Sequence, residues 1–147
     1  MLPPGFEKTL FSSGSDCQLF KLDNFTVALL ICYDVEFPEN VRYAAVNGAD
    51  LVVVPTALGE NWGVVSEAVV PARAFENGVY LAYANHCGTE NNLRYFGGSC
   101  IIGPDGVENA RAKKDIAVIG ATLSKANVVA AQDRLPYLTE RVKLPWA

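Results

Sequence analysis

The sequence predicts an α/β fold, in which strands and helices alternate along the chain. Three apolar segments have the length of buried strands, and amphipathic segments with helix start and stop signals separate them. The chain has 147 residues, of which 50% are hydrophobic and 19% are charged. This composition fits one folded domain and excludes a disordered chain. Parallel strands need cover on both faces, and the predicted helices are too few to supply all of it.

The first part of the chain predicts a hairpin followed by a helix. Residues 17–22 and 25–32 are predicted strands, joined by a turn at Asp23 and Asn24. A helix is predicted over 38–47, because proline opens it and Gly48 follows its end. The predicted order of these elements places residue 32 between a strand and a helix.

The rest of the chain continues the alternation. Pro71 is expected to kink or split the second helix. Beyond it, the glycine-rich stretch at 103–106 predicts a turn, and the tail at 135–147 shows no periodicity. The predicted elements are a strand at 51–55, a helix at 63–77, a strand at 79–85, a polar loop at 88–98, and strands at 99–102 and 116–122.

Charge and cysteine usage exclude several classes of partner. The net charge is −4, with 12 Lys and Arg against 16 Asp and Glu and no basic run, which disfavours nucleic acid and anionic membrane surfaces. No apolar run approaches the roughly 20 residues of a membrane span, and residues 1–5 do not resemble a signal peptide. The four cysteines form no CxxC pair and there is one histidine, so no metal site is predicted. We expect reduced cysteines and a cytoplasmic location.

Cys32 stands out by its position. It ends a predicted strand shortly before a predicted helix, and binding sites in α/β sheets form beyond the carboxyl ends of strands. Backbone N–H groups and a helix N-terminus near a thiol favour the reactive thiolate. The alternative is a small buried hydrophobic side chain, as most free cysteines are.

The segment around Cys32 resembles a known family. The stretch ICYDVEFPENVR at 31–42 is similar to the nucleophile segment of the nitrilase, or carbon–nitrogen hydrolase, superfamily. Ala28 departs from the glycine usual in that pattern, which affects packing. Further matching stretches follow in order: NGAD at 47–50, LVVVP at 51–55, ARAFEN at 72–77, Asn85, GGS at 97–99 and GPDG at 103–106.

The resemblance implies a fold and a set of roles. The fold would be the αββα sandwich of the nitrilase type, with residues 1–147 as its C-terminal half, a partial domain ending in the tail at 135–147. Cys32 would be the nucleophile, and the backbone N–H of Tyr33 would help to hold the oxyanion. Glu7 would orient the catalytic lysine and the substrate, unless it is only a solvated carboxylate. The general-base glutamate and the lysine have no match in this sequence.

The implied reaction is hydrolysis of a non-peptide C–N bond, in an amide or a nitrile, through a thioester on cysteine. The closest similarity is to small aliphatic amidases, which need no cofactor or metal. Without the base and the lysine, we expect this chain alone to have little or no activity. The expected partners are a small amide or nitrile and either a second copy of the chain or the missing half. The alternative is a non-catalytic remnant or interaction module of the same fold.

Thr56, Ala57 and Trp62 are candidate substrate-binding residues, because they follow the end of the strand at 51–55. Loop packing is the other interpretation of these three.

Charged residues near Cys32 are expected to have structural roles. Asp34, Glu39 and Arg42 are predicted to form an ion-pair cluster that fixes the turn after Cys32, and Arg73 is predicted to pair with Glu76. A Cys32–His86 dyad is a rival catalytic arrangement.

Overall fold

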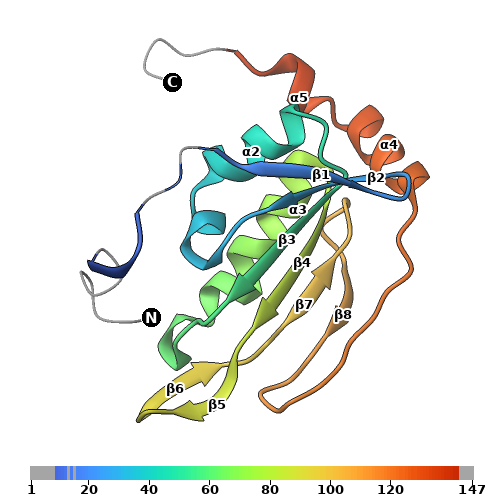
Figure 1. Cartoon of the computed structure of the whole chain (residues 1–147). Coiled ribbons are helices and arrows are strands. Elements are labelled where there is room, and N and C mark those ends of the chain that lie inside the picture. The colour runs from blue at the N-terminus through green and yellow to red at the C-terminus, as the bar shows by residue number, and fades with distance from the viewer. Residues whose placement is uncertain (1–8, 13, 15, 143–147) are drawn as a thin grey trace.

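The computed structural model describes residues 9–12, 14 and 16–142. Its main feature is a six-stranded sheet in the order β1-β2-β3-β4-β7-β8, with a separate two-stranded sheet of β5 and β6 (Figure 1). The strands are β1 (Gln18–Leu22), β2 (Phe25–Leu29), β3 (Leu51–Thr56), β4 (Tyr80–Asn85), β5 (Cys87–Glu90), β6 (Leu93–Phe96), β7 (Cys100–Ile102) and β8 (Glu108–Arg111).

The centre of the large sheet is parallel and its edges are antiparallel. Strands β2, β3 and β4 run parallel, as predicted for apolar strands separated by helices. The predicted hairpin of β1 and β2 is confirmed, and β7 and β8 add an antiparallel edge on the other side. The carboxyl ends of the three parallel strands therefore lie at one end of the sheet, next to Cys32.

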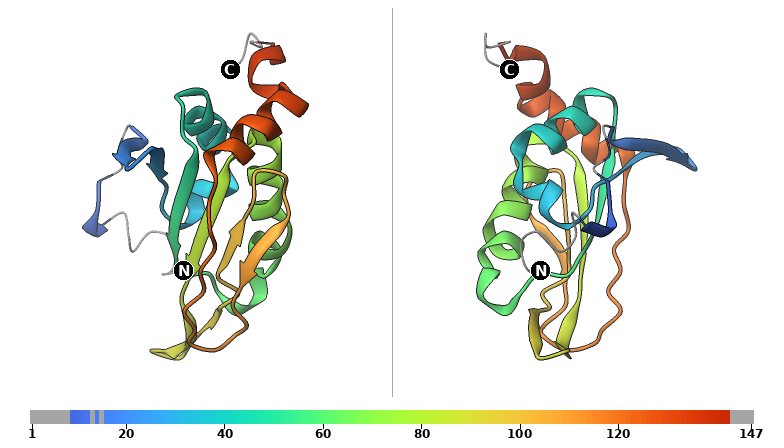
Figure 2. Two further views of the ribbon diagram at one scale, coloured as in Figure 1. Left: turned by 90° about the vertical axis from the view of Figure 1, so that its right-hand side faces the viewer. Right: turned by 60° about the vertical axis from the view of Figure 1, so that its left-hand side comes forward.

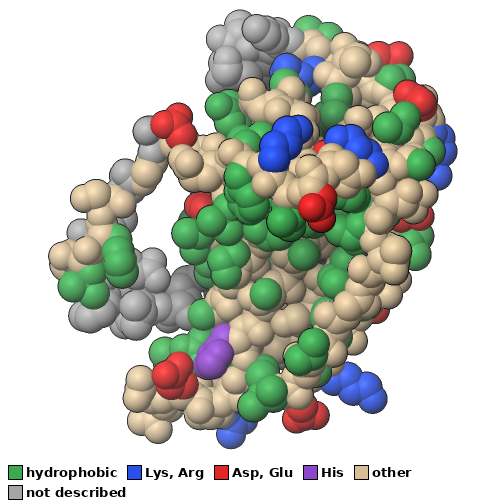
Figure 3. Space-filling model, turned by 45° about the vertical axis from the view of Figure 1, so that its right-hand side comes forward, with side chains coloured by type: hydrophobic (Ala, Val, Ile, Leu, Met, Phe, Trp, Pro, Cys, Tyr) green, Lys and Arg blue, Asp and Glu red, His purple; other side chains and the backbone are tan. Residues whose placement is uncertain are grey.

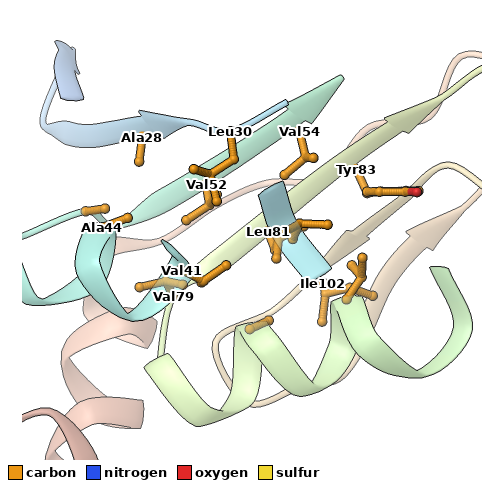
Figure 4. Close-up of a cluster of buried hydrophobic side chains, with 14 of the residues drawn as sticks. Ala28, Leu30, Val41, Ala44, Val52, Val54, Val79, Leu81, Tyr83 and Ile102 are labelled. Carbon is orange, nitrogen blue, oxygen red and sulfur yellow. The ribbon is translucent and has the colours of Figure 1, made fainter. Parts of the chain in front are cut away.

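Two helices cover one face of the sheet. These are α2 (Pro38–Val46) and α3 (Val70–Asn77), which lie behind the strands in Figure 1 and to one side of them in Figure 2. Figure 4 shows the side chains buried in this layer, including Val41, Val52 and Leu81, each fully buried. Burying each such side chain stabilises the fold by roughly 1.5–3 kcal/mol. This layer is the main core of the described residues.

The second face of the sheet is covered only in part. Helix α4 (Lys125–Arg134) packs at the end where the parallel strands begin, with Val128 against Leu51 and Tyr80. One row of this face crosses the sheet as Leu29, Val53, Ala82, Ile101 and Ala110, paired strand to strand. Hydrophobic side chains gather in the middle of this side of the molecule (Figure 3). The prediction that the helices cannot cover the whole sheet is confirmed for the described residues.

Several predicted boundaries are wrong. The strand predicted over 25–32 ends at Leu29, and Cys32 instead opens a 3-10 helix, η1 (Cys32–Glu36). The loop predicted over 88–98 contains the β5–β6 hairpin. The strand predicted over 116–122 is irregular, because Ile116 and Val118 are 94% and 101% exposed and no described strand pairs with them. The predicted unpatterned tail contains a short helix, α5 (Tyr137–Glu140).

The helix predicted over 63–77 forms as two segments that meet next to Pro71. A π-helical turn, η3 (Val65–Val69), is followed directly by α3, with Pro71 in its first turn. Proline lacks the N–H that an α-helix needs, and a local π-turn accommodates the missing bond. The short 3-10 helix η2 (Glu60–Trp62) precedes these segments.

Candidate active site

The backbone at Cys32 adopts a conformation that is rare for a residue with a side chain. Its φ is +50°, in the left-handed region, at the sharp turn between β2 and η1. This conformation costs roughly 1–2 kcal/mol for an L-residue other than glycine. Strained backbone of this kind persists where surrounding contacts hold it, and it clusters at functional sites. The Cys32 side chain is half-buried, so it is not sealed in the apolar interior.

Asp34 fixes the first side of this turn. Its Oδ2 accepts a hydrogen bond from the N–H of Ile31 at 3.0 Å, and its own N–H donates to the carbonyl of Ile31 at 3.0 Å. The side-chain amide of Asn40 donates to the carbonyl of Asp34 at 2.9 Å. The two bonds between Ile31 and Asp34 close the chain around Cys32 and hold its unusual φ.

Arg73 fixes the other side of the turn from α3. Its Nε and Nη2 donate to the carbonyls of Val35 and Glu36, at 3.2 Å and 2.8 Å. Its Nη1 contacts Glu76 Oε1 at 3.1 Å, which confirms the predicted pair. The arginine thus satisfies carbonyl groups at the end of η1 and connects the cysteine turn to the core helix.

The predicted cluster of Asp34, Glu39 and Arg42 is wrong in its partners. Asp34 fixes the turn through backbone hydrogen bonds, and no ion pair joins Glu39 to Arg42 within residues 16–142. The Nη1 atom of Arg42 is buried without a hydrogen-bond partner there. Sequence spacing on one helix did not reveal that the arginine that fixes the turn comes from α3.

Tyr83 is a residue near the site that the sequence did not indicate. It lies on β4 opposite Val54, in the row of the sheet that continues to Leu30, the residue just after β2. Burial raises the pKa of its phenol well above the usual value, and the charges of Cys32 and Glu36 raise it further. The Thr56 hydroxyl partly offsets this rise, although the two groups do not reach hydrogen-bond geometry. No alternation or motif distinguishes Tyr83 from an ordinary core tyrosine.

The predicted substrate-binding residues differ in their position and exposure. Thr56 ends β3 beside Tyr83, on the side of the sheet that faces η1. Ala57 follows it directly, and Trp62 lies in η2 with 55% of its surface exposed. Tyr33 is 54% exposed and packs edge-to-face on Phe37, with ring centroids 4.9 Å apart. Glu7 lies outside the described residues.

His86 has partners other than Cys32. Its Nε2 lies 3.4 Å from Glu90 Oε2, and its ring packs edge-to-face on Tyr95 at 4.4 Å. Both partners belong to the β5–β6 hairpin. The structure therefore gives no support to a Cys32–His86 dyad.

The described part of the chain contains no group of three or more His, Cys, Asp or Glu residues arranged to hold a metal ion. None of its helices is both long and apolar enough to cross a bilayer. One surface hollow, of about 300 Å³, lies between the turn at 103–105, β8 and α4, and a second, of about 440 Å³, lies between η3, β6 and β8. Cys32 lines neither.

Comparison with known proteins identifies the family. A model of the carbon–nitrogen hydrolase family matches residues 2–133. The chain belongs to the carbon–nitrogen hydrolase family. A hydrolase encoded in the pqqF 5′ region of Pseudomonas protegens is 43% identical over 136 residues, covering 92% of this chain and 48% of that protein. An (R)-stereoselective amidase of a Pseudomonas species is 32% identical, covering 92% of this chain and 50% of that protein.

Solved structures of this family show the same fold. An amidase from Nesterenkonia sp. AN1 matches with a TM-score of 0.81 and 41% identity, over 92% of this chain and 50% of that one. A variant of that amidase carries the acetamide moiety of fluoroacetamide attached covalently at its active site cysteine, and it matches with a TM-score of 0.81. The predicted α/β fold of the nitrilase type is therefore confirmed. The chain spans about half the length of the curated relatives it matches.

Proposed function

We propose that this chain carries the cysteine nucleophile of an amidase of the carbon–nitrogen hydrolase family. The observation that supports this most directly is the left-handed turn at Cys32, held by Asp34 on one side and by Arg73 on the other. Such a turn presents the sulfur at the carboxyl end of a parallel strand, where α/β sheets form their sites. A related amidase is modified covalently at its active site cysteine, which agrees with this role.

In the proposed reaction, the Cys32 thiolate attacks the carbonyl carbon of an amide and forms an S–C bond. The C–N bond then breaks, and ammonia or an amine leaves with a proton. Water attacks the thioester, releases the acid and restores the thiol. The N–H of Tyr33 is proposed to donate to the oxyanion. The substrate pocket is proposed to be lined by Thr56, Ala57 and Trp62. Glu7 is proposed to orient the lysine and the substrate. A nitrile is the second substrate class.

The proton transfers need groups that the sequence does not match. General acid–base assistance contributes roughly 10²–10⁴-fold to such reactions. We therefore propose that the chain alone has little or no amidase activity, and that a segment carrying the glutamate and lysine completes the site. The proposed cellular setting is the cytoplasm, which agrees with four free cysteines among the described residues.

Selective alkylation tests the nucleophile. With limiting iodoacetamide at neutral pH, we expect Cys32 to react faster than Cys17 and Cys100, because burial raises the pKa of both of those thiols and keeps them protonated. Peptide mass spectrometry locates the adducts, and Cys32→Ser and Cys87→Ser chains are the matched controls. If Cys32 is not labelled selectively, the non-catalytic alternative gains support.

Complementation tests the reaction itself. This chain is mixed with the N-terminal half of the related Pseudomonas protegens hydrolase, and ammonia release from simple amides is measured. We expect activity in the mixture that the Cys32→Ser chain does not give. A stable complex without activity would contradict the catalytic proposal and favour an interaction module.

A further inference from the structure

The hydroxyl of Tyr83 is buried without a hydrogen bond. The side chain is 2% exposed, and its oxygen has no partner among the described residues. Tyr80, on the same strand, shows the usual arrangement: its hydroxyl accepts from the N–H of Ser124 at 3.2 Å and from Asn127 Nδ2 at 3.1 Å. A buried hydroxyl without a partner costs free energy that phenylalanine would avoid. The Tyr83 hydroxyl therefore needs an explanation other than core packing.

Its place in the sheet brings this hydroxyl to the cysteine turn. Tyr83 pairs with Val54, and the N–H of Leu30 donates to the neighbouring carbonyl of Val53. Leu30, Val54 and Tyr83 thus lie side by side at the carboxyl end of the parallel strands, and Cys32 follows Leu30 by two residues. Figure 4 shows Tyr83 at this end of the cluster, with its oxygen pointing away from the other labelled side chains.

Acidic groups near this phenol raise its pKa. The charges of Cys32 and Glu36 both raise the Tyr83 pKa, in addition to the larger effect of burial. The phenol is therefore neutral at physiological pH, when it has a proton to donate. Glu36 is half-exposed at the far end of η1, and burial raises its pKa as well. Cys100, which pairs with Tyr83 between β4 and β7, also raises the Tyr83 pKa, but burial raises the pKa of that thiol and keeps it protonated at neutral pH. The anions that the neutral hydroxyl can face at neutral pH are therefore the Cys32 thiolate and the Glu36 carboxylate.

We propose that Tyr83 is a positioning residue for Cys32, whose hydroxyl donates a hydrogen bond to the Cys32 thiolate as it forms. This proposal rests on the proposed role of Cys32 as nucleophile. No such bond exists among the described residues, so the contact requires the thiolate and the hydroxyl to approach each other. No proton leaves Tyr83. The hydroxyl is sealed from solvent, so it acts on the sulfur from the core side while the substrate approaches from outside.

The test compares two tyrosine-to-phenylalanine changes on one strand. In the whole chain, the rate of iodoacetamide alkylation at Cys32 is measured by peptide mass spectrometry over a range of pH. We expect Tyr83→Phe to slow alkylation about tenfold at neutral pH, because hydrogen bonds to charged groups are among the stronger ones. The difference should close at high pH, where the thiol is ionised in both chains. Tyr80→Phe should leave the rate unchanged but lower the denaturation midpoint.

Two further measurements separate the outcomes. In the Glu36→Gln background, the Tyr83→Phe effect should persist, and its disappearance would assign the hydroxyl to Glu36 and overturn the proposal. An unchanged alkylation rate in Tyr83→Phe would also overturn it. If Cys32 is not labelled selectively in the chain without substitutions, the proposed function is overturned instead. If Tyr83→Phe does not fold, a second measurement uses the Tyr33→Phe chain, which lacks the tyrosine next to Cys32 in the sequence. Its near-ultraviolet tyrosine absorption is compared before and after alkylation of Cys32, and an unchanged spectrum would overturn the proposal.

Discussion

At the scale of single residues, the site depends on one strained backbone position. Cys32 holds a left-handed φ that glycine adopts freely, and bonds from Asp34 and Arg73 on either side hold it there. The sequence identified Cys32 from its motif and position. It did not identify Arg73 as the residue that fixes the turn, because the two meet only when α3 packs beside η1.

The strain at Cys32 can be measured by two small substitutions. We expect Cys32→Gly to be more stable than Cys32→Ala by about 1 kcal/mol, because alanine keeps the cost of a left-handed φ and glycine does not. Urea denaturation followed by circular dichroism gives the difference. At Cys17, which has no positive φ, the same pair should show the opposite order. An alanine chain as stable as the glycine chain would show that the turn carries no strain.

The contribution of Arg73 can be measured against a surface arginine. We expect Arg73→Met to lower the free energy of unfolding by about 2–3 kcal/mol, because it leaves two carbonyls at the end of η1 without their charged donor. Arg94 is 73% exposed and lies 3.8 Å from Glu60, so Arg94→Met should cost less than about 1 kcal/mol. Equal losses in urea titrations of the two chains would contradict the role of Arg73.

At the scale of elements, local signals predicted the central strands and the first helices. Apolar runs indicated β2, β3 and β4, and proline and glycine marked α2 and the start of α3. The apolar run at 116–122 was misassigned, because a strand also needs a partner, and pairing is not a local property. Helix α4 was missed because only Val128 and Ala131 are buried on it, which leaves little periodicity.

Gly78 tests how closely α3 and α4 approach each other. It ends α3 with φ +58°, and an added Cβ would lie 2.8 Å from Cγ of Gln132 on α4. Gly48 ends α2 with φ +89° and open space around it. Gly48→Ala should cost about 1 kcal/mol for its φ alone, and Gly78→Ala should cost more. Equal shifts in thermal midpoint for the two chains would show that Gln132 on α4 can move away from the added Cβ without loss of stability.

At the scale of the whole molecule, the uneven cover of the sheet is the main feature. One face is packed under α2 and α3, while the row that includes Leu29 and Ile101 on the other face is only partly covered by the described residues. Apolar strands exposed on one face favour association. The sequence predicted this because it offered too few helices, but it could not show which face lacks them.

We therefore expect the chain to associate through this face, with a second copy or with a polypeptide that carries the other half of the family fold. Light scattering over a range of concentrations should show species larger than a monomer. Leu29→Gln should weaken that association, because Leu29 is 37% exposed on the uncovered face, whereas Val107→Gln, in the β7–β8 turn, should not. A monomer at every concentration would contradict the expectation.

The bonds from Arg73 have a dynamic consequence. Because the guanidinium of Arg73, on α3, donates hydrogen bonds to two carbonyls of η1, local unfolding of the turn and of α3 should occur together. Amide hydrogen exchange in η1 should then follow the slow exchange of α3 rather than the faster fraying of β1 at the sheet edge. The part of the chain that presents the sulfur would thus be among the last to unfold locally.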